Sequence, residues 1–410
     1  MQYIVIYLMK LTHTILTFLL SSFQLPACAA DNTPATFLRA GTFDVTVMDY
    51  FMARTFHSDP NATTQAQAIG GKLLYKTPYA AGFAAGIGVY TAQKMPFSPK
   101  STDGSNVLAP GQKSFSVLGL SYLNYKFGNT ELTIYRQLID TPFINPNDIR
   151  IAPVTYEAYT VRNTSLPGLK LTASQVTKIK EWTSTEFVSL PKAAGYDINK
   201  SVTMLGAEYQ LSDDLKTQLW NYQAYDFLNT SYFQFDKKWK RSDWNYSLSG
   251  QAMAQTDTGK AIAGRIKSAM GGIMLGAGTH GANAQVAYTQ AANGTDMVNP
   301  FAGFPGYTSI MEEDCDLDGQ KAWLLGFNYD FSGAGLPGLY AETDYTQAYI
   351  PSSDDKSFPT QHEINFIMRY SFADYWKGLS VTFKTAYVYH SQRLGDTDYY
   401  DYRLITAYKF

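Results

Sequence analysis

The chain has 410 residues, of which 15% are aromatic, led by 31 tyrosines, while only 17% are charged. Soluble enzymes cover their surface with charge, so this balance disfavours a soluble enzyme and favours a β-barrel whose outside meets lipid between aromatic girdles. The formal net charge of −2 argues against nucleic acid as a partner.

The N-terminal segment has the pattern of a targeting signal. Lys10 supplies a positive charge, residues 15–20 form an apolar stretch, and Ala27-Cys28-Ala29-Ala30 provide the small residues of a cleavage site. We predict a signal peptide over residues 1–30 and one barrel domain over residues 31–410. A lipoprotein signal with an acylated Cys28 is the alternative, which Pro26 disfavours. Cleavage at the favoured site leaves Cys315 alone in the mature chain, so no intramolecular disulfide is expected.

Four segments in the last quarter of the chain alternate between apolar or aromatic residues and polar ones, which is the period of a β-strand. We expect the apolar rows to face lipid and the polar rows to face the lumen of a barrel. The last segment ends on Phe410, which resembles the terminal signature that the barrel-assembly machinery recognises in outer-membrane proteins. The segments are 323–331, 363–372, 379–390 and 401–410.

Counting such segments along the chain gives roughly 18 strands, an even number as bacterial barrels require. The sequence therefore predicts an all-β, transmembrane antiparallel barrel in the bacterial outer membrane, with short periplasmic turns and long external loops. Its outside is expected to contact lipid and lipopolysaccharide. The pattern is weak over 165–200 and 255–282. Predicted external loops are about 49–65, 93–114, 140–153, 180–200, 255–267, 291–321, 348–360 and 391–399.

Motifs that would indicate an enzyme are scarce. No Ser lies in a G-x-S-x-G context, and the histidines have no metal-ligand spacing such as H-E-x-x-H. We therefore predict that the protein is not an enzyme and carries no catalytic residue or cofactor, with calcium as the one exception considered below. A barrel hydrolase is the disfavoured alternative.

Several segments resemble the OprD family of outer-membrane porins. The resemblance is carried by YRQLIDTPFINPNDIR at 135–150, by the hairpin at 70–91, by Asn299-Pro300-Phe301, and by Gly335-Leu336-Pro337-Gly338-Leu339. It implies an 18-stranded barrel, often a homotrimer, whose third and seventh external loops fold inward to narrow the pore. It also implies an Arg and Lys track along one lumen wall that guides carboxylate-bearing solutes, with acidic and polar loop residues opposite.

Basic residues on predicted inward rows are candidates for this track. Guanidinium groups stay charged and offer a planar fork of donors, so a carboxylate can pass from one to the next. Arg39 is placed in the first strand, which must pair with the last strand and so lie near Arg403. The alternative is that these are ordinary lumen charges solvated by pore water. The candidates are Arg39, Arg136, Arg369, Lys384 and Arg403.

The third loop, 140–148, is rigid for a loop because Pro142 and Pro146 fix two backbone angles. A rigid loop suits a constriction. Asp140 is a further candidate to line it. Asp148 and Arg150 could line the eyelet or pin the loop to the wall, and the sequence leaves both readings open.

The predicted loop 291–321, which we take to be the seventh loop of the family, carries a run of acids, of which Glu312, Glu313 and Asp314 are candidates for the acidic side of the eyelet. The spacing of Asp314, Asp316 and Asp318 matches the start of a calcium-binding EF-hand loop, but the later position that needs a bidentate Glu falls inside a strand. Eyelet, calcium site and solvated acidic loop remain as alternatives.

The residues together predict a porin for passive, substrate-selective diffusion of small polar solutes, with carboxylates or amino acids favoured. A general non-selective porin is the main alternative. An adhesin with a plugged lumen is disfavoured, because inward positions such as Glu342, Asp344 and Arg369 indicate a wet lumen.

Overall fold

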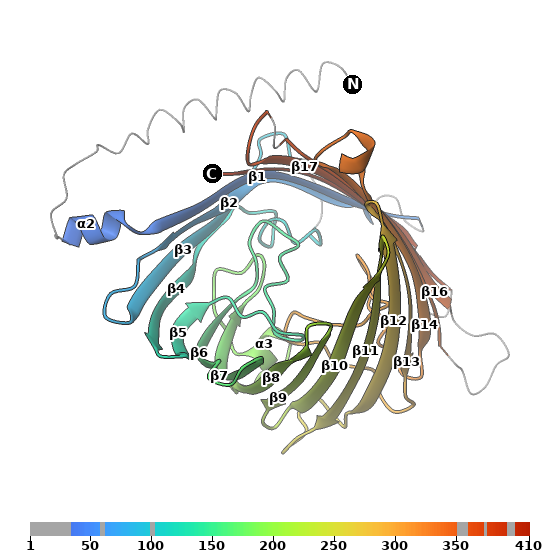
Figure 1. The fold of residues 1–410 in the computed structure, drawn as a ribbon, viewed down its shortest axis with the longest axis horizontal. Helices are drawn as coiled ribbons and strands as arrows, with labels where there is room; N and C mark the ends of the chain where they lie inside the picture. The colour runs from blue at the N-terminus through green and yellow to red at the C-terminus, as the bar shows by residue number, and fades with distance from the viewer. Residues whose placement is uncertain (1–33, 58–61, 99–102, 351–359, 373–374, 392–397) are drawn as a thin grey trace. The chain divides into compact units, whose positions relative to one another are not determined.

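The computed structural model describes residues 34–57, 62–98, 103–350, 360–372, 375–391 and 398–410, so the predicted signal peptide lies outside the described residues. Eighteen antiparallel strands form one sheet that closes on itself, because β1 pairs with β18 as well as with β2 (Figure 1). Closure leaves no unpaired strand edge, as a lipid environment demands. The predicted all-β antiparallel barrel is confirmed.

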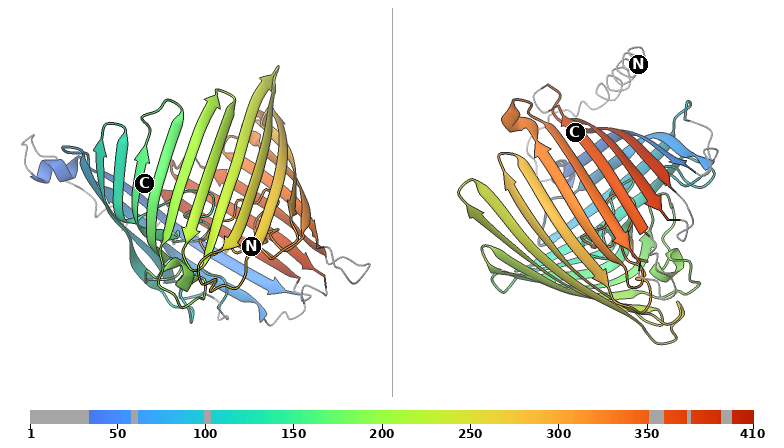
Figure 2. Two further views of the ribbon diagram at one scale, coloured as in Figure 1. Left: turned by 90° about the horizontal axis from the view of Figure 1, so that it is seen from below. Right: turned by 90° about the vertical axis from the view of Figure 1, so that its right-hand side faces the viewer.

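Each strand pairs with its neighbours in sequence, and the strands are tilted across the barrel wall (Figure 2). The strands are β1 (Thr42–Phe56), β2 (Thr64–Lys76), β3 (Phe83–Lys94), β4 (Phe115–Phe127), β5 (Thr130–Gln137), β6 (Thr155–Asn163), β7 (Leu169–Lys180), β8 (Val202–Ser212), β9 (Leu215–Ala224), β10 (Leu228–Arg241), β11 (Trp244–Asp257), β12 (Lys267–Thr279), β13 (Ala282–Ala291), β14 (Lys321–Asp330), β15 (Leu339–Tyr349), β16 (Thr360–Ser371), β17 (Leu379–His390) and β18 (Tyr399–Lys409).

The described residues include the helices α2 (Pro34–Arg39) and α3 (Leu190–Ala193) and the 3-10 helix η2 (Phe331–Ala334). None of the described helices is long and apolar enough to cross a membrane. Arg39 ends α2, and β1 begins only at Thr42, so the prediction that Arg39 lies in the first strand is wrong. Pro34 at the first helical position favours the helix there, because its fixed φ is already helical.

The alternation predicted for the late strands is present in the burial of their side chains. In β18, Tyr400, Tyr402 and Leu404 are exposed on the outside, whereas Asp401 and Arg403 are buried on the inside. The turn between β12 and β13 places His280 and Gly281 at φ of 48° and 85°, and positive φ at both central residues is the geometry that tight hairpins prefer.

The connections differ in two places from those predicted. Residues 49–56 belong to β1, so the first external loop begins at His57, well after its predicted start. A short external connection at 225–227, between β9 and β10, was not predicted. The inward residues Tyr50 and Met52 of β1 are apolar and pack in a buried cluster, which removes the polar inner row that marks the late strands.

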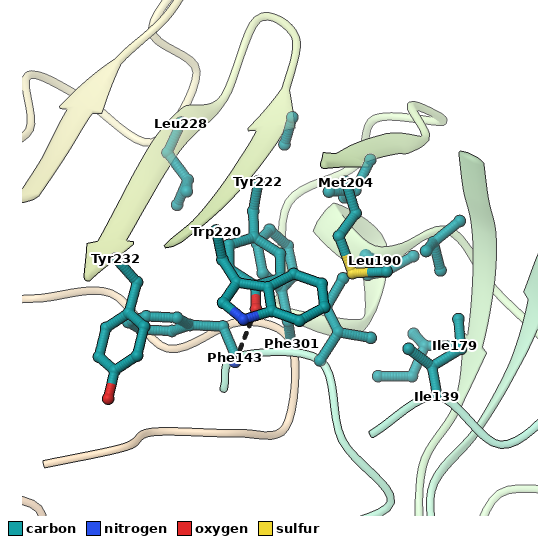
Figure 3. Close-up of a cluster of buried hydrophobic side chains, with 14 of the residues drawn as sticks. Ile139, Phe143, Ile179, Leu190, Met204, Trp220, Tyr222, Leu228, Tyr232 and Phe301 are labelled. Atoms are coloured by element: carbon teal, nitrogen blue, oxygen red, sulfur yellow. Dashed lines mark hydrogen bonds between the residues drawn. The ribbon is translucent and has the colours of Figure 1, made fainter. Parts of the chain in front are cut away.

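External loops fill a large part of the lumen and pack against the inner wall. The third loop (138–154) contributes Phe143 and the seventh loop (292–320) contributes Phe301 to an apolar cluster on the inner face of β6 to β12 (Figure 3). The backbone N–H of Phe143 donates to the Tyr222 hydroxyl at 3.4 Å, across the loop and the wall. A second cluster joins Ile151 of the third loop to β1 through β4 and to the second loop (95–114). The third and seventh loops are therefore fixed parts of the folded barrel.

Candidate functional site

The third and seventh loops are tied directly to each other inside the lumen. Ile144 and Ala302 form a β-bridge, the Gly303 N–H donates to the Phe143 carbonyl at 3.1 Å, and the Asn147 side chain donates to the Ala302 carbonyl at 2.7 Å. A Cβ atom at Gly303 would lie 2.2 Å from the Asn145 amide nitrogen, so glycine permits this close approach. The two loops are therefore joined inside the lumen, and both fold inward as the resemblance implied.

A buried carboxylate on the wall anchors the acidic segment of the seventh loop. Glu363 in β16 is 1% exposed, and its carboxylate accepts the backbone N–H groups of Met311 (3.1 Å), Glu312 (3.1 and 3.2 Å) and Glu313 (3.0 Å). Hydrogen bonds to a charged acceptor are the stronger kind. Glu363 therefore fixes where the side chains of these loop residues point.

Glu312 is placed between two arginines on the wall. Its carboxylate pairs with Arg54 of β1 and with Arg403 of β18, and Asp401 bonds the same two arginines at 3.3 and 2.7 Å. The four side chains carry two positive and two negative charges, so the group is neutral. Glu312 was expected on an acidic side facing the basic wall; it lies on the basic wall instead.

Glu313, the next predicted eyelet acid, is bonded to the external ends of three strands. The Tyr399 hydroxyl donates to it at 2.7 Å, the His390 imidazole lies 3.3 Å away, and the Gln361 amide donates at 3.3 Å. Glu312 and Glu313 therefore both hold the loop to the wall.

The inward basic residues of β16 to β18 occupy successive rows of the sheet. In the strand register, Arg54 lies opposite Asp401 in one inward row, and Lys384 lies opposite Arg403 in the next inward row. Arg369 lies opposite Thr382, one inward row further from the external loops. Two residues along a strand span about 7 Å. In the described part of the chain, Lys384 and Arg369 have no carboxylate at ion-pair distance, although Arg369 lies 5.3 Å from the Tyr340 ring.

Arg136 lies on a different face from the one predicted. Strand pairing places it in one row with Ile87, Ser121, Glu157 and Lys178. Ile87 is 50% exposed, whereas its neighbours Gly86 and Gly88 belong to the buried inward row, so this row faces outward. The prediction that Arg136 faces the lumen is therefore wrong.

The alternation of the strand accounts for this placement. Thr133 and Gln137 are the buried inward residues of β5, and Arg136 lies an odd number of positions from both, so it belongs to the opposite row. Tyr135 departs from the alternation: it has φ of 78°, a left-handed conformation, and its ring lies beside the Arg136 guanidinium, 5.2 Å away. Arg136 bonds Glu157 at 3.1 Å and stacks on Phe187 at 4.1 Å.

Arg150 pins the third loop, which was one of its two predicted roles. Its Nε donates to the Ser105 carbonyl of the second loop at 2.9 Å, and burial lowers the pKa of this guanidinium from its usual value. Asp148 and Asp140 are exposed. Desolvation raises the pKa of Asp148, against the effect of Lys72. No ion pair ties Asp140 or Asp148 to another described residue.

A chamber of about 320 Å³ lies between the loops and the wall of β13 to β18. On the loop side it is lined by Ile149 and by Tyr307 and Met311. Its charged lining comes from the wall: Glu342, Asp344, Lys384 and Arg403. A wider space of about 700 Å³ lies between the third, fourth (181–201) and seventh loops. The wall side of the smaller chamber is therefore polar and charged.

The acids of the calcium alternative do not converge. Asp316 accepts from Asn299 at 2.6 Å, and Asp318 accepts from the Gly294 N–H at 2.6 Å. Across the described residues no group of three His, Cys, Asp or Glu side chains is arranged to hold a metal ion. Burial and neighbouring carboxylates raise the pKa of Asp314 to about 7 and that of Asp316 to about 6. Calcium stays a prediction without structural support.

The family model for outer membrane porins of the OprD family matches residues 35–410. The chain belongs to the OprD family of outer-membrane porins. It is therefore an outer-membrane channel protein, in contact with lipid on its outside and with small solutes in its lumen. No match is found among curated protein sequences.

Solved structures with the same fold include three channels whose aligned regions cover 91% of this porin and 99% of their own chains. OpdK of Pseudomonas aeruginosa, solved with vanillate, is 19% identical with a TM-score of 0.81. OccK2 (OpdF) of the same organism, in complex with glucuronate, is 17% identical with a TM-score of 0.77. OccAB3 of Acinetobacter baumannii is 17% identical with a TM-score of 0.82. At these identities the likeness shows the fold alone.

Two residues of this OprD-family site escaped the sequence reasoning. Arg54 was hidden because residues 49–65 were assigned to a loop; the alternation of Tyr50, Met52 and Arg54 in β1 is the signal that could have found it. Glu363 was expected to face inward, but its role depends on contacts with residues about fifty positions away, which no local pattern reveals.

Proposed function

We propose that this porin provides passive, solute-selective diffusion of small carboxylate-bearing molecules. The observation that carries the proposal is the chamber between the inward-folded loops and the wall. This chamber lies against Lys384 and Arg403, with Arg369 one row further along the wall. A solute that crosses the barrel by this route passes these cations at close range.

The spacing of the cations suits transfer of a carboxylate from one to the next. Successive rows lie about 7 Å apart along a strand. Several weak sites in series let a solute enter and also leave, whereas one tight site would retain it. Lys384 and Arg369 have no carboxylate partner among the described residues, so an incoming carboxylate does not have to displace one.

The printed descriptions of two relatives agree with this chemistry. OpdK was solved with vanillate and OccK2 in complex with glucuronate, and both ligands are carboxylates. Their low identity to this chain leaves the solute of this porin to be determined by experiment. A general, non-selective porin is the second candidate, because the wider space between the loops, of about 700 Å³, could admit many solutes.

Single-channel recording of the refolded mature protein in a planar bilayer tests the proposal. A panel of small carboxylates is expected to block the current, and Lys384→Met or Arg369→Ala is expected to weaken the block. Arg136→Ala is the matched control, because its side chain belongs to the outward row. Large current steps that respond to no carboxylate would instead favour the general porin.

We also propose that the barrel is inserted by the barrel-assembly machinery through Phe410, assembles as a homotrimer and contacts lipopolysaccharide with its external outer surface. The exposed apolar residues of the outer wall support a lipid or subunit environment. Native gels of the detergent-extracted protein test the trimer, and deletion of Phe410 tests insertion.

A further inference from the structure

An outer cluster of charged side chains, formed by Arg136, Glu157 and Lys178, lies on the outward face of the wall. Glu157 of β6 accepts from the Arg136 Nε of β5 at 3.1 Å, and the Lys178 ammonium of β7 lies 3.1 Å from its other oxygen. Strand pairing places the three residues in one outward row. Arg136 is the last residue but one of β5, and Lys178 lies two residues before the end of β7, so the outer cluster is close to the external loops.

The outer cluster has more hydrogen-bond donors than the protein uses. Its two cations share one carboxylate, so its net charge is +1. Arg136 also donates from Nη1 to the Leu118 carbonyl at 3.0 Å, but its Nη2 donates to no described residue. Lys178 is bonded to Glu157 alone among the described residues, and 45% of its side chain is exposed. A charge on the lipid-facing side of a barrel is costly in the hydrocarbon and tolerable near the headgroups, where an anion can pair with it.

Aromatic rings hold the Arg136 guanidinium in position. It lies 4.1 Å from the ring of Phe187 in the fourth loop and 5.2 Å from the ring of Tyr135. Phe187 is fixed because the next residue, Val188, forms a β-bridge with Ile179 of β7. Tyr135 has φ of 78°, a conformation that a residue other than glycine adopts only at a cost. Residues held in such conformations are concentrated at functional sites, and here the conformation brings a second ring to the guanidinium.

An apolar hollow of about 450 Å³ lies in the outer wall beside the outer cluster. Its lining includes Ile87 and Ser121, which belong to the same row as Arg136. It also includes Leu123 and Ile134 of the next outward row, which is further from the external loops. The hollow therefore extends from the cationic cluster along the wall, away from the external surface.

This order of features matches a phosphorylated lipid of the outer leaflet. Such a lipid holds its headgroup near the external surface and its acyl chains below, and the lipid A part of lipopolysaccharide carries phosphate groups. Arg and Lys bind phosphate through charge-assisted hydrogen bonds, and Arg offers a planar fork of donors. We propose that Arg136 and Lys178 bind a lipid A phosphate of lipopolysaccharide, with an acyl chain of the same lipid in the hollow beside them. This inference rests on the proposed contact with lipopolysaccharide, to which it assigns residues.

Binding of lipid A to the refolded mature protein in a non-ionic detergent tests the proposal. Dissociation constants are measured for bisphosphorylated lipid A, for lipid A from which both phosphates have been removed, and for inorganic phosphate. Bisphosphorylated lipid A is expected to bind about tenfold more tightly than the dephosphorylated lipid, a difference that one charged hydrogen bond can account for. Inorganic phosphate is expected to bind more weakly than bisphosphorylated lipid A, because it cannot fill the hollow.

Two substitutions test the assigned residues. Arg136→Ala and Lys178→Met are each expected to weaken binding of bisphosphorylated lipid A about tenfold and to leave binding of the dephosphorylated lipid unchanged. Lys170→Met is the matched control. Lys170 lies on the same strand, is 43% exposed and bonds Glu208 at 2.7 Å, but it belongs to the inward row of the buried Thr172. The shift in gel mobility on heating shows that each variant has folded.

The outcomes separate this site from the broader proposal. If the wild type binds no lipid A, both the site and the proposed contact with lipopolysaccharide fail. If both variants bind bisphosphorylated lipid A as tightly as the wild type, or if Lys170→Met weakens binding as much as they do, the site alone is refuted. Inorganic phosphate binding as tightly as bisphosphorylated lipid A would overturn the lipid assignment in favour of a site for free phosphate. Loss of a trimer on native gels in Lys178→Met, with unchanged lipid affinity, would assign the outer cluster to a subunit contact instead.

Discussion

Replacing Glu312 by glutamine is expected to shift the channel towards anions. Glu312 neutralises Arg54 and Arg403, and Asp401 is the other carboxylate bonded to them among the described residues. Glutamine keeps the length of the side chain but removes its charge, so the group of four side chains changes from neutral to a net charge of +1. The backbone bonds from the loop to Glu363 do not involve the Glu312 side chain, so the loop is expected to stay in place.

The size of the shift follows from Coulomb's law. An anion passing about 5 Å from one uncompensated charge gains about 1 kcal/mol if the pore water screens as bulk water does, and about 3 kcal/mol at a protein-like effective dielectric constant. The lower figure corresponds to about a fivefold change in relative anion permeability. Salt weakens the effect, because the Debye length shortens from about 10 Å at 0.1 M to 3 Å at 1 M.

Reversal potentials in a potassium chloride gradient measure this shift, first at low and then at high salt. Glu157→Gln is the control, since it removes a carboxylate bonded to an arginine, Arg136, on the outward row. Equal selectivity in Glu312→Gln and the wild type would refute the charge compensation. A shift in Glu157→Gln as large as in Glu312→Gln would refute the outward placement of Arg136.

Three further predictions concern the seventh loop. Because the pKa of Asp314 is raised to about 7 and that of Asp316 to about 6, both acids gain protons as the pH falls from 8 to 5. The lumen then loses negative charge, and anion permeability should rise with a midpoint at a pH between these two pKa values. The same pH-dependent rise in the double variant Asp314→Asn, Asp316→Asn would contradict this explanation. Cys315 is buried and its pKa is raised to about 12, so maleimide should label it only slowly at neutral pH until the protein is denatured. Glu363→Gln removes the charged acceptor that holds the loop, so Cys315 should be labelled faster; an unchanged rate would show that Glu363 is dispensable for docking.

The sequence predicts the barrel best where lipid and water meet the two faces of a strand. In β16 to β18 the outward row is apolar and the inward row is polar, so the period of two is plain. In β1 both rows contain apolar residues, because Tyr50 and Met52 are covered by loops that fold into the lumen. Alternation fails there for a physical reason: the inward face of β1 meets protein.

The candidate site was predicted only in part, because its key contacts join distant segments. Lys384 and Arg403 lie where the alternation placed them. Arg136 was assigned to the wrong row, because Thr133 and Gln137 are the inward residues of β5 and the left-handed Tyr135, whose ring lies on the Arg136 side, interrupts the alternation there. The pairing of Glu312 with Arg54 and Arg403 spans 258 and 91 residues, respectively, and no spacing in the sequence encodes it.

The inward-folded seventh loop changes what a row of basic residues means in this channel. By delivering Glu312 to Arg54 and Arg403, the loop neutralises two cations of the wall, whereas Lys384, beside Arg403, and Arg369, one row further along, form no ion pair with another described residue. If the channel is selective as proposed, its selectivity depends on which cations lack a protein partner, and the number of arginines alone is a poor guide to it. A row without any ion-paired cation would hold a carboxylate tightly and slow its release, whereas neutralised cations beside unpaired ones would permit both binding and exit.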